Sequence, residues 1–209
     1  GSGKTLAGFL MCINDLYLRH SAGESTTGAR VAYVSPLKAL AVDIAENLEG
    51  PLREIEAIAA EMGLDAPELT IGVRTGDTTP SERASLVRNP PTFVVTTPES
   101  LYLLVTAAKS RSVLGSMETV IVDEIHALAR DKRGAHLCLT LERLDHVCDQ
   151  PPVRVGLSAT QKPIETVARI LVGSRSAPDG TPDVAIVDSG HQRNLDVALE
   201  LPAGELEAV

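Results

Sequence analysis

An apolar stretch at residues 119–126, Thr-Val-Ile-Val-Asp-Glu-Ile-His, ends in two adjacent carboxylates. A short run rich in β-branched residues is typical of a strand buried on both faces of a parallel sheet. Asp123 and Glu124 then stand at the carboxyl end of that strand. In open α/β sheets the ligand crevice lies outside the carboxyl ends of the strands. The stretch therefore favours an α/β fold with an acidic ligand site at one edge of its sheet.

Strand-like and helix-like patterns alternate along the chain. Pro51 fits the first turn of a helix, so we expect a separate helix to begin there and to end at Gly63. Strands alternating with helices at this spacing indicate an α/β domain with a doubly wound, mostly parallel sheet. Besides the strand that precedes Asp123, we expect strands at residues 31–34, 69–74, 93–96, 154–157 and 184–187, and helices at residues 5–19, 37–48, 51–63, 80–87, 101–105, 135–147 and 163–172.

The first residues of the chain supply a partner for the two acids. Gly1, Ser2, Gly3, Lys4 and Thr5 match the end of the phosphate-binding loop G-x-x-x-x-G-K-[ST], so the chain begins inside that motif. In such a loop Lys4 would contact the β- and γ-phosphates and Thr5 would ligate Mg²⁺. We expect the sheet to lack the strand upstream of this loop, which would leave a gap near its centre.

The two carboxylates have distinct expected roles in a nucleotide site. Asp123 would hold the same Mg²⁺, usually through water, and Glu124 would orient and deprotonate the attacking water. The alternative is that the glycine-rich start is a flexible terminus and the two acids are a solvated pair. The buried strand that ends in both acids favours the nucleotide site.

The charge of the chain limits how it could bind nucleic acid. Its 28 acidic and 19 basic residues give a net charge of -9, so binding would need a local basic patch rather than the overall field. Aromatic residues make up only 2% of the chain, which argues against single-strand binding by base stacking. This composition does not argue against contacts to the phosphate backbone of a nucleic acid.

Composition also indicates the cellular compartment. No apolar run approaches the roughly 18 residues that a membrane span needs, so we expect no membrane partner. The three cysteines form no Cys-x-x-Cys pair and are odd in number, which argues against a disulfide framework. We therefore expect a cytoplasmic protein.

Six motifs occur in a fixed order along the chain: Gly-Ser-Gly-Lys-Thr (1–5), Ser-Pro-Leu-Lys-Ala-Leu (35–40), Thr-Gly-Asp-Thr (75–78), Thr-Thr-Pro-Glu-Ser (96–100), Asp-Glu-Ile-His (123–126) and Ser-Ala-Thr (158–160). This order resembles that of superfamily 2 helicase motifs. The chain is similar to the first RecA-like domain of a DExH-box helicase, and most similar to the bacterial large helicase-related family. The resemblance covers nearly the whole chain, and the ordered set is far more specific than any single motif.

The resemblance implies a fold and an activity. It implies a RecA-like P-loop NTPase domain that binds ATP and Mg²⁺ and couples ATP hydrolysis to movement on single-stranded DNA or RNA, with a role in DNA repair. Residues 1–188 would form the ATP-binding domain, and residues 189–209 would lead toward a second RecA-like domain that this chain lacks. Because superfamily 2 helicases place an arginine finger on that second domain, we expect the isolated chain to hydrolyse ATP very slowly or not at all.

The resemblance also assigns residues. His126 would link the ATP site to the face between the two domains, and three turns that follow strands could line one groove for the nucleic-acid backbone. The alternative for Pro36 and Pro98 is that they only begin helices, and the alternative for the Ser-Ala-Thr motif is a helix cap. The residues implied in nucleic-acid binding are Ser35, Pro36, Lys38, Thr75, Gly76, Asp77, Thr97, Pro98 and Glu99, and those implied in coupling are Ser158, Ala159 and Thr160.

Two other functions stay open at this point. One is a non-catalytic fragment that binds only nucleic acid or a partner protein. The other is a different P-loop enzyme, such as a small-molecule kinase, although a kinase would not explain the Thr-Thr-Pro-Glu-Ser and Ser-Ala-Thr motifs.

Overall fold

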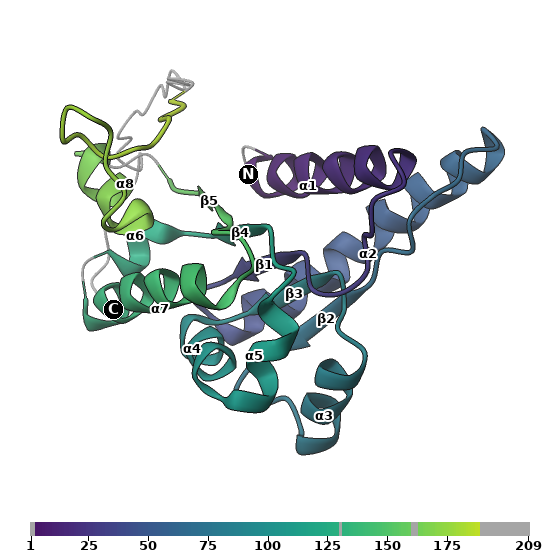
Figure 1. The fold of residues 1–209 in the computed structure, drawn as a ribbon, viewed down its shortest axis with the longest axis horizontal. Helices are drawn as coiled ribbons and strands as arrows, with labels where there is room; N and C mark the ends of the chain where they lie inside the picture. Colours follow the sequence, from purple (N-terminus) through teal and green to yellow (C-terminus); the bar gives the residue numbers. More distant parts are fainter. Residues whose placement is uncertain (1–2, 130, 160–162, 189–209) are drawn as a thin grey trace, which may run out of the picture.

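The computed structural model describes residues 3–129, 131–159 and 163–188. Five strands among these residues form one parallel sheet in the order β2-β3-β1-β4-β5 (Figure 1). This arrangement confirms the predicted α/β fold with a parallel sheet. The strands are β1 (Val31–Val34), β2 (Ile71–Arg74), β3 (Phe93–Thr96), β4 (Thr119–Val122) and β5 (Val153–Gly156).

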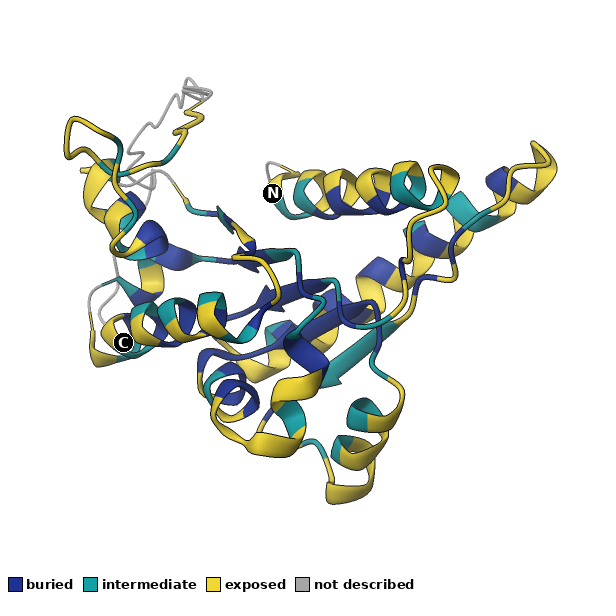
Figure 2. Ribbon diagram, in the orientation of Figure 1, coloured by how far each residue is buried: buried dark blue, intermediate teal, exposed yellow. Residues whose placement is uncertain are grey.

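Helices cover both faces of this sheet. The α1 and α2 helices pack on the face that carries Tyr33 and Ile121, whereas α4, α5 and α7 pack on the face that carries Val34 and Val120. The inner strands β1, β3 and β4 between these layers are deeply buried, whereas the edge strands β2 and β5 are partly exposed (Figure 2). Among the described residues, no helix combines the length and the apolar character needed to cross a bilayer. The helices are α1 (Lys4–Ser21), α2 (Lys38–Glu61), α3 (Pro80–Arg88), α4 (Pro98–Thr106), α5 (Ala108–Leu114), α6 (Ile125–Leu128), α7 (Lys132–Val147) and α8 (Ile164–Val172).

The centre of the sheet differs from the prediction. The central strand β1 pairs with β3 on one side and with β4 on the other, so that Val31 lies opposite both Phe93 and Thr119. The sheet formed by the described residues is therefore continuous, and the predicted gap near its centre is wrong. Since β2 and β5 are its edges, a further strand could pair only there.

The segment around Pro51 also differs from the prediction. We expected two helices, but α2 continues through Pro51 from Lys38 to Glu61. A proline inside a helix costs about 3 kcal/mol because it removes one backbone hydrogen bond. The buried residues of α2 lie on one stripe both before and after Pro51, from Ala41 to Ala59. The part of that stripe from Ala41 to Leu52 packs in one core cluster with β1 and β3, and this packing holds the helix together across Pro51.

The predicted strand at residues 184–187 is wrong. These residues form no strand, no strand of the described residues pairs with them, and Val187 is 91% exposed. A single antiparallel bridge between Ser176 and Pro182 lies just before them. The short helices α5 and α6 were not anticipated, and the predicted connector at residues 189–209 lies outside the described part of the chain.

Candidate functional site

The two acids after β4 are held in a defined geometry. The backbone N–H of Asp123 donates to the Val34 carbonyl at 2.9 Å, which fixes the end of β4 beside β1. The buried Asp123 carboxylate accepts two hydrogen bonds: Oδ1 from the Glu124 backbone N–H at 2.9 Å, and Oδ2 from the Tyr33 hydroxyl. Glu124 has φ 45° and is the one non-glycine residue with a positive φ in the described ranges. Such left-handed geometry is costly and is concentrated at functional sites.

The predicted nucleotide residues lie together. Lys4 and Thr5, at the start of α1, line a cleft of about 610 Å³ with Asp123, Glu124 and Ser158. A volume of this size lies within the range of ligand sites. Gly3 also lines the cleft and adopts φ 72° just before α1, whereas the predicted Gly1 and Ser2 lie outside the described residues. The N-terminus of α1 therefore opens into the cleft that holds both acids, and exposed helix N–H groups favour anions there.

His126 connects the acids with the turn after β5. Its Nδ1 lies 3.3 Å from the Ala159 backbone nitrogen, 3.4 Å from Ser158 Oγ and 3.2 Å from Glu124 Oε2. An amide N–H can only donate, so Nδ1 accepts it in the neutral tautomer whose proton is on Nε2. The same atom can donate to Glu124 only when it carries a proton. Nδ1 of His126 therefore makes a hydrogen bond either to the Ala159 N–H or to the Glu124 carboxylate, but not to both at once. The remaining predicted coupling residue, Thr160, lies outside the described part of the chain.

The turns predicted to bind nucleic acid follow β1, β2 and β3 at the same edge of the sheet. The first two are joined by an ion pair between Lys38 Nζ and Asp77 Oδ1 at 2.7 Å. Arg133, at the start of α7, joins the first and third: its Nε donates to Glu99 Oε1 and its guanidinium also donates to the Pro36 carbonyl, both at 2.7 Å. The structure therefore brings all three turns together.

Exposure separates these residues into two groups. The side chains that a strand of nucleic acid could reach directly are few, because Ser35, Pro36, Thr75, Thr97 and Pro98 are buried. Lys38, Gly76, Asp77 and Glu99 are exposed.

Burial by itself raises the pKa of Glu99, but hydrogen bonds from Arg133 and the backbone and attraction to the guanidinium outweigh it and lower that pKa overall.

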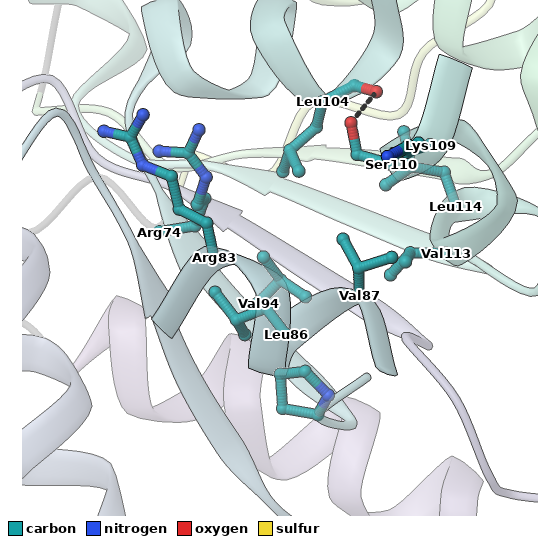
Figure 3. A pocket seen from close by; sticks show the side chains of 11 residues that line it. Arg74, Arg83, Leu86, Val87, Val94, Leu104, Lys109, Ser110, Val113 and Leu114 are labelled. Atoms are coloured by element: carbon teal, nitrogen blue, oxygen red, sulfur yellow. Dashed lines mark hydrogen bonds between the residues drawn. The ribbon is translucent and has the colours of Figure 1, made fainter. Parts of the chain in front are cut away.

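Two arginines that sequence reasoning missed support the second turn. Arg74 donates to the Thr75 carbonyl at 2.7 Å, and Arg83 donates to the Gly76 carbonyl at 2.9 Å. Figure 3 shows the two guanidinium groups side by side next to a cavity of about 130 Å³ that α3, α4 and α5 otherwise line mostly with apolar side chains. Burial lowers the pKa of Arg74, and the nearby charge of Arg83 lowers it further. No local motif marks either residue, because their contacts depend on how α3 packs against the edge of the sheet.

Tyr33 was also missed, although a sequence signal existed. It is the one residue with a polar tip in the otherwise apolar strand β1, and a buried tyrosine hydroxyl usually requires a hydrogen-bond partner. That partner is Asp123.

Comparison with known proteins agrees with this geometry. The chain is 48% identical over 206 residues to the Lhr helicase/probable uracil glycosylase of Mycolicibacterium smegmatis, covering 99% of this chain and 13% of that protein. It is 47% identical over 207 residues to the ATP-dependent helicase Lhr-Core protein 2 of Thermococcus barophilus, covering 99% of this chain and 24% of that protein. The chain thus spans less than a quarter of the length of these relatives.

A solved structure gives the same result in three dimensions. The structure of Mycobacterium smegmatis helicase Lhr bound to ssDNA and AMP-PNP matches with a TM-score of 0.76 and 53% identity, over 84% of this chain and 22% of that one. A family model for the DEAD/DEAH box helicase matches residues 1–169. With the phosphate-loop residues, the two acids and the Ser158–His126 contact in one RecA-like fold, the chain belongs to the DEAD/DEAH box helicase family.

Proposed function

We propose that this chain is the ATP-binding motor domain of an ATP-dependent DNA helicase, in which hydrolysis of Mg-ATP drives movement along single-stranded DNA. The observation that carries the proposal is the cleft in which Lys4 and Thr5 meet Asp123 and Glu124. Similarity to a helicase solved with ssDNA and AMP-PNP supports both ligands.

The residues of the cleft fit Mg²⁺ and a triphosphate. Mg²⁺ prefers oxygen ligands and keeps several waters, so one hydroxyl from Thr5 and one carboxylate from Asp123 suffice on the protein side. Each Asp123 oxygen accepts one hydrogen bond in the structure and so retains a lone pair for a metal-bound water. When bound, Mg²⁺ would neutralise charge on the phosphate oxygens.

The remaining residues of the cleft would act on the phosphates and on water. Lys4 would bind the β- and γ-phosphates together with the N–H groups that begin α1. The Glu124 side chain is 46% exposed, so water can reach the carboxylate that would orient and deprotonate the nucleophile. His126 contacts both Glu124 and the turn at Ser158, and would relay the state of the nucleotide to that turn.

The nucleic-acid surface would be the edge formed by the turns after β1, β2 and β3. Its two exposed carboxylates, Asp77 and Glu99, are each paired with a cation, Lys38 and Arg133, so the charges of these four groups cancel. Binding would then rely on the backbone amides of these turns, which contact phosphates without reading bases. Because few free cations would be involved, the affinity should depend only weakly on salt.

Calorimetric titration of Mg-ATP into this chain and into Lys4→Ala tests the proposal. Loss of a charge-assisted contact worth about 1.5–3 kcal/mol should weaken binding about ten- to hundredfold. Lys109→Ala is the matched control, since Lys109 is exposed on α5, a helix that packs on the other face of the sheet from α1.

Equal affinity of the folded wild type and Lys4→Ala for Mg-ATP would contradict the proposed nucleotide site. A second titration adds a fluorescent single-stranded DNA oligonucleotide to the same proteins. Mg-ATP binding without any DNA binding would refute the motor role and leave a nucleotide-binding domain only.

A further inference from the structure

Tyr33 has a polar tip at the nucleotide cleft and a ring that belongs to the core. It lies in the central strand β1, is fully buried, and has apolar neighbours on either side in the strand. Its ring stacks on Phe9 of α1 with centroids 4.8 Å apart and an interplanar angle of 20°. The ring therefore fixes the position of the hydroxyl between the sheet and the helix that carries Lys4 and Thr5.

The Tyr33 hydroxyl lies where the predicted metal ligands meet. It donates to Asp123 Oδ2 across 90 residues of sequence. Burial raises the pKa of Tyr33, and the hydrogen bond to Asp123 and the charge of that carboxylate raise it further. One buried hydroxyl thus contacts the carboxylate proposed to hold Mg²⁺, and Thr5, the other proposed ligand, lines the same cleft as that carboxylate.

We propose that Tyr33 is a positioning residue for the metal site, which fixes the Asp123 carboxylate next to Thr5 before Mg²⁺ arrives. This inference rests on the proposed function, and it adds a residue that touches neither the nucleotide nor the metal. Two fixed points, the Tyr33 hydroxyl on Oδ2 and the Glu124 N–H on Oδ1, set the plane of the carboxylate. Groups that orient metal ligands in this way typically change metal affinity about 10–100-fold when they are removed.

Tyr33→Phe tests the proposal, because it removes the hydroxyl and keeps the ring that stacks on Phe9. ATP binding is measured by calorimetry with Mg²⁺ present and again in EDTA. We expect affinity for Mg-ATP to fall at least about tenfold and affinity for metal-free ATP to stay unchanged. Tyr17→Phe is the matched control, since Tyr17 packs against the same core cluster and its hydroxyl makes no hydrogen bond within the described residues.

The outcomes separate the two proposals. Wild-type affinity for Mg-ATP in folded Tyr33→Phe would overturn the positioning role while leaving the nucleotide site intact. Equal losses with Mg²⁺ and in EDTA would also overturn it, since they would show a purely structural effect. If Lys4→Ala binds Mg-ATP like the wild type, the proposed function fails instead.

A second measurement needs neither the Tyr33 variant nor nucleotide binding. The chain has no tryptophan and three tyrosines, so in Tyr17→Phe/Tyr102→Phe all intrinsic emission comes from Tyr33. A carboxylate that accepts a hydrogen bond from the phenol hydroxyl quenches tyrosine fluorescence. Adding Asp123→Asn should therefore raise the emission, and Mg²⁺ should change the emission only when Asp123 is present. Emission that responds to neither change would overturn the inference.

Discussion

A buried charge network at the edge strand β5 makes a quantitative prediction about stability. The Arg154 side chain is only 1% exposed, and its guanidinium pairs with Glu142 at 2.9 Å and with Asp145 at 2.8 Å. Asp145 also accepts from Arg175 at 2.7 Å. The network joins β5 to α7 and to the segment that follows α8, so its loss should destabilise the whole edge of the sheet at β5.

Asp145→Ala removes the carboxylate that two arginines share. Breaking a buried ion pair costs about 3–5 kcal/mol, because the remaining charge is left in the interior. Glu142 still pairs with Arg154, which places the cost near the lower limit, and alanine gains about 0.5 kcal/mol of helix propensity in α7. The expected loss is therefore about 3 kcal/mol.

Urea unfolding of the wild type and the variant measures this loss. With a urea dependence of about 2 kcal/mol per molar, the midpoint should fall by about 1.5 M. Arg53→Ala is the control, because the Arg53–Glu49 pair on α2 is 74% and 53% exposed, and such a pair contributes at most about 0.5 kcal/mol.

A midpoint shift of about 0.25 M or less for Asp145→Ala would refute the reasoning, since an exposed pair would give as much. Adding Arg154→Met to Asp145→Ala removes the buried charge that has lost one of its two partners and should recover part of the loss. No recovery would show that packing, rather than the uncompensated charge, causes the effect.

Two further predictions concern backbone approach and acid stability. A β-carbon at Gly134 would lie 2.2 Å from the Leu128 carbonyl oxygen, so Gly134→Ala should lower the free energy of unfolding, measured with urea, by about 3 kcal/mol. A β-carbon at Gly50, inside α2, would meet no atom within 4 Å, so Gly50→Ala should raise the free energy of unfolding by about 0.5–1 kcal/mol. Equal effects at the two glycines would contradict this explanation. Because the pKa of Glu99 is lowered in the folded state, its contribution to stability is present above its ordinary pKa of 4.5 and is lost as the pH falls through the folded value. Urea midpoints measured from pH 6 to pH 3 should therefore fall less steeply for Glu99→Gln than for the wild type, and parallel curves would count against the Arg133 pair.

Strands were predicted correctly from the sequence where an apolar run also has neighbouring strands to pair with in the sheet. Residues 31–34 and 93–96 match β1 and β3, because these apolar runs are bounded by turn-forming residues and are buried on both faces. Residues 184–187 have a similar apolar character, but no strand of the described part of the chain pairs with them. Pro51 illustrates the opposite error, since its local preference for a helix start was outweighed by the packing of α2 on the sheet.

For the candidate site, the sequence located the residues but not their contacts. The order of the motifs indicated the helicase family, which the family match confirms, and strand ends placed the acids and the turns at one edge. The roles of Lys4, Thr5, Asp123 and Glu124 remain predictions. Arg133 bridges Glu99 and the Pro36 carbonyl, and no local pattern indicates that contact, because both partners lie far from it in the sequence.

What the sequence determined by itself is local: which segments form strands, which face of a helix is apolar, and which residues follow each strand. What only the tertiary structure decided is the set of partners. Tyr33 reaches Asp123 because β1 and β4 are adjacent, and Arg133 reaches Pro36 because α7 begins beside the turn after β1. The physical reason is that these pairs are separated by 90 and 97 residues. Periodicity encodes the direction of each side chain within its own element, whereas the order of the strands determines which elements meet.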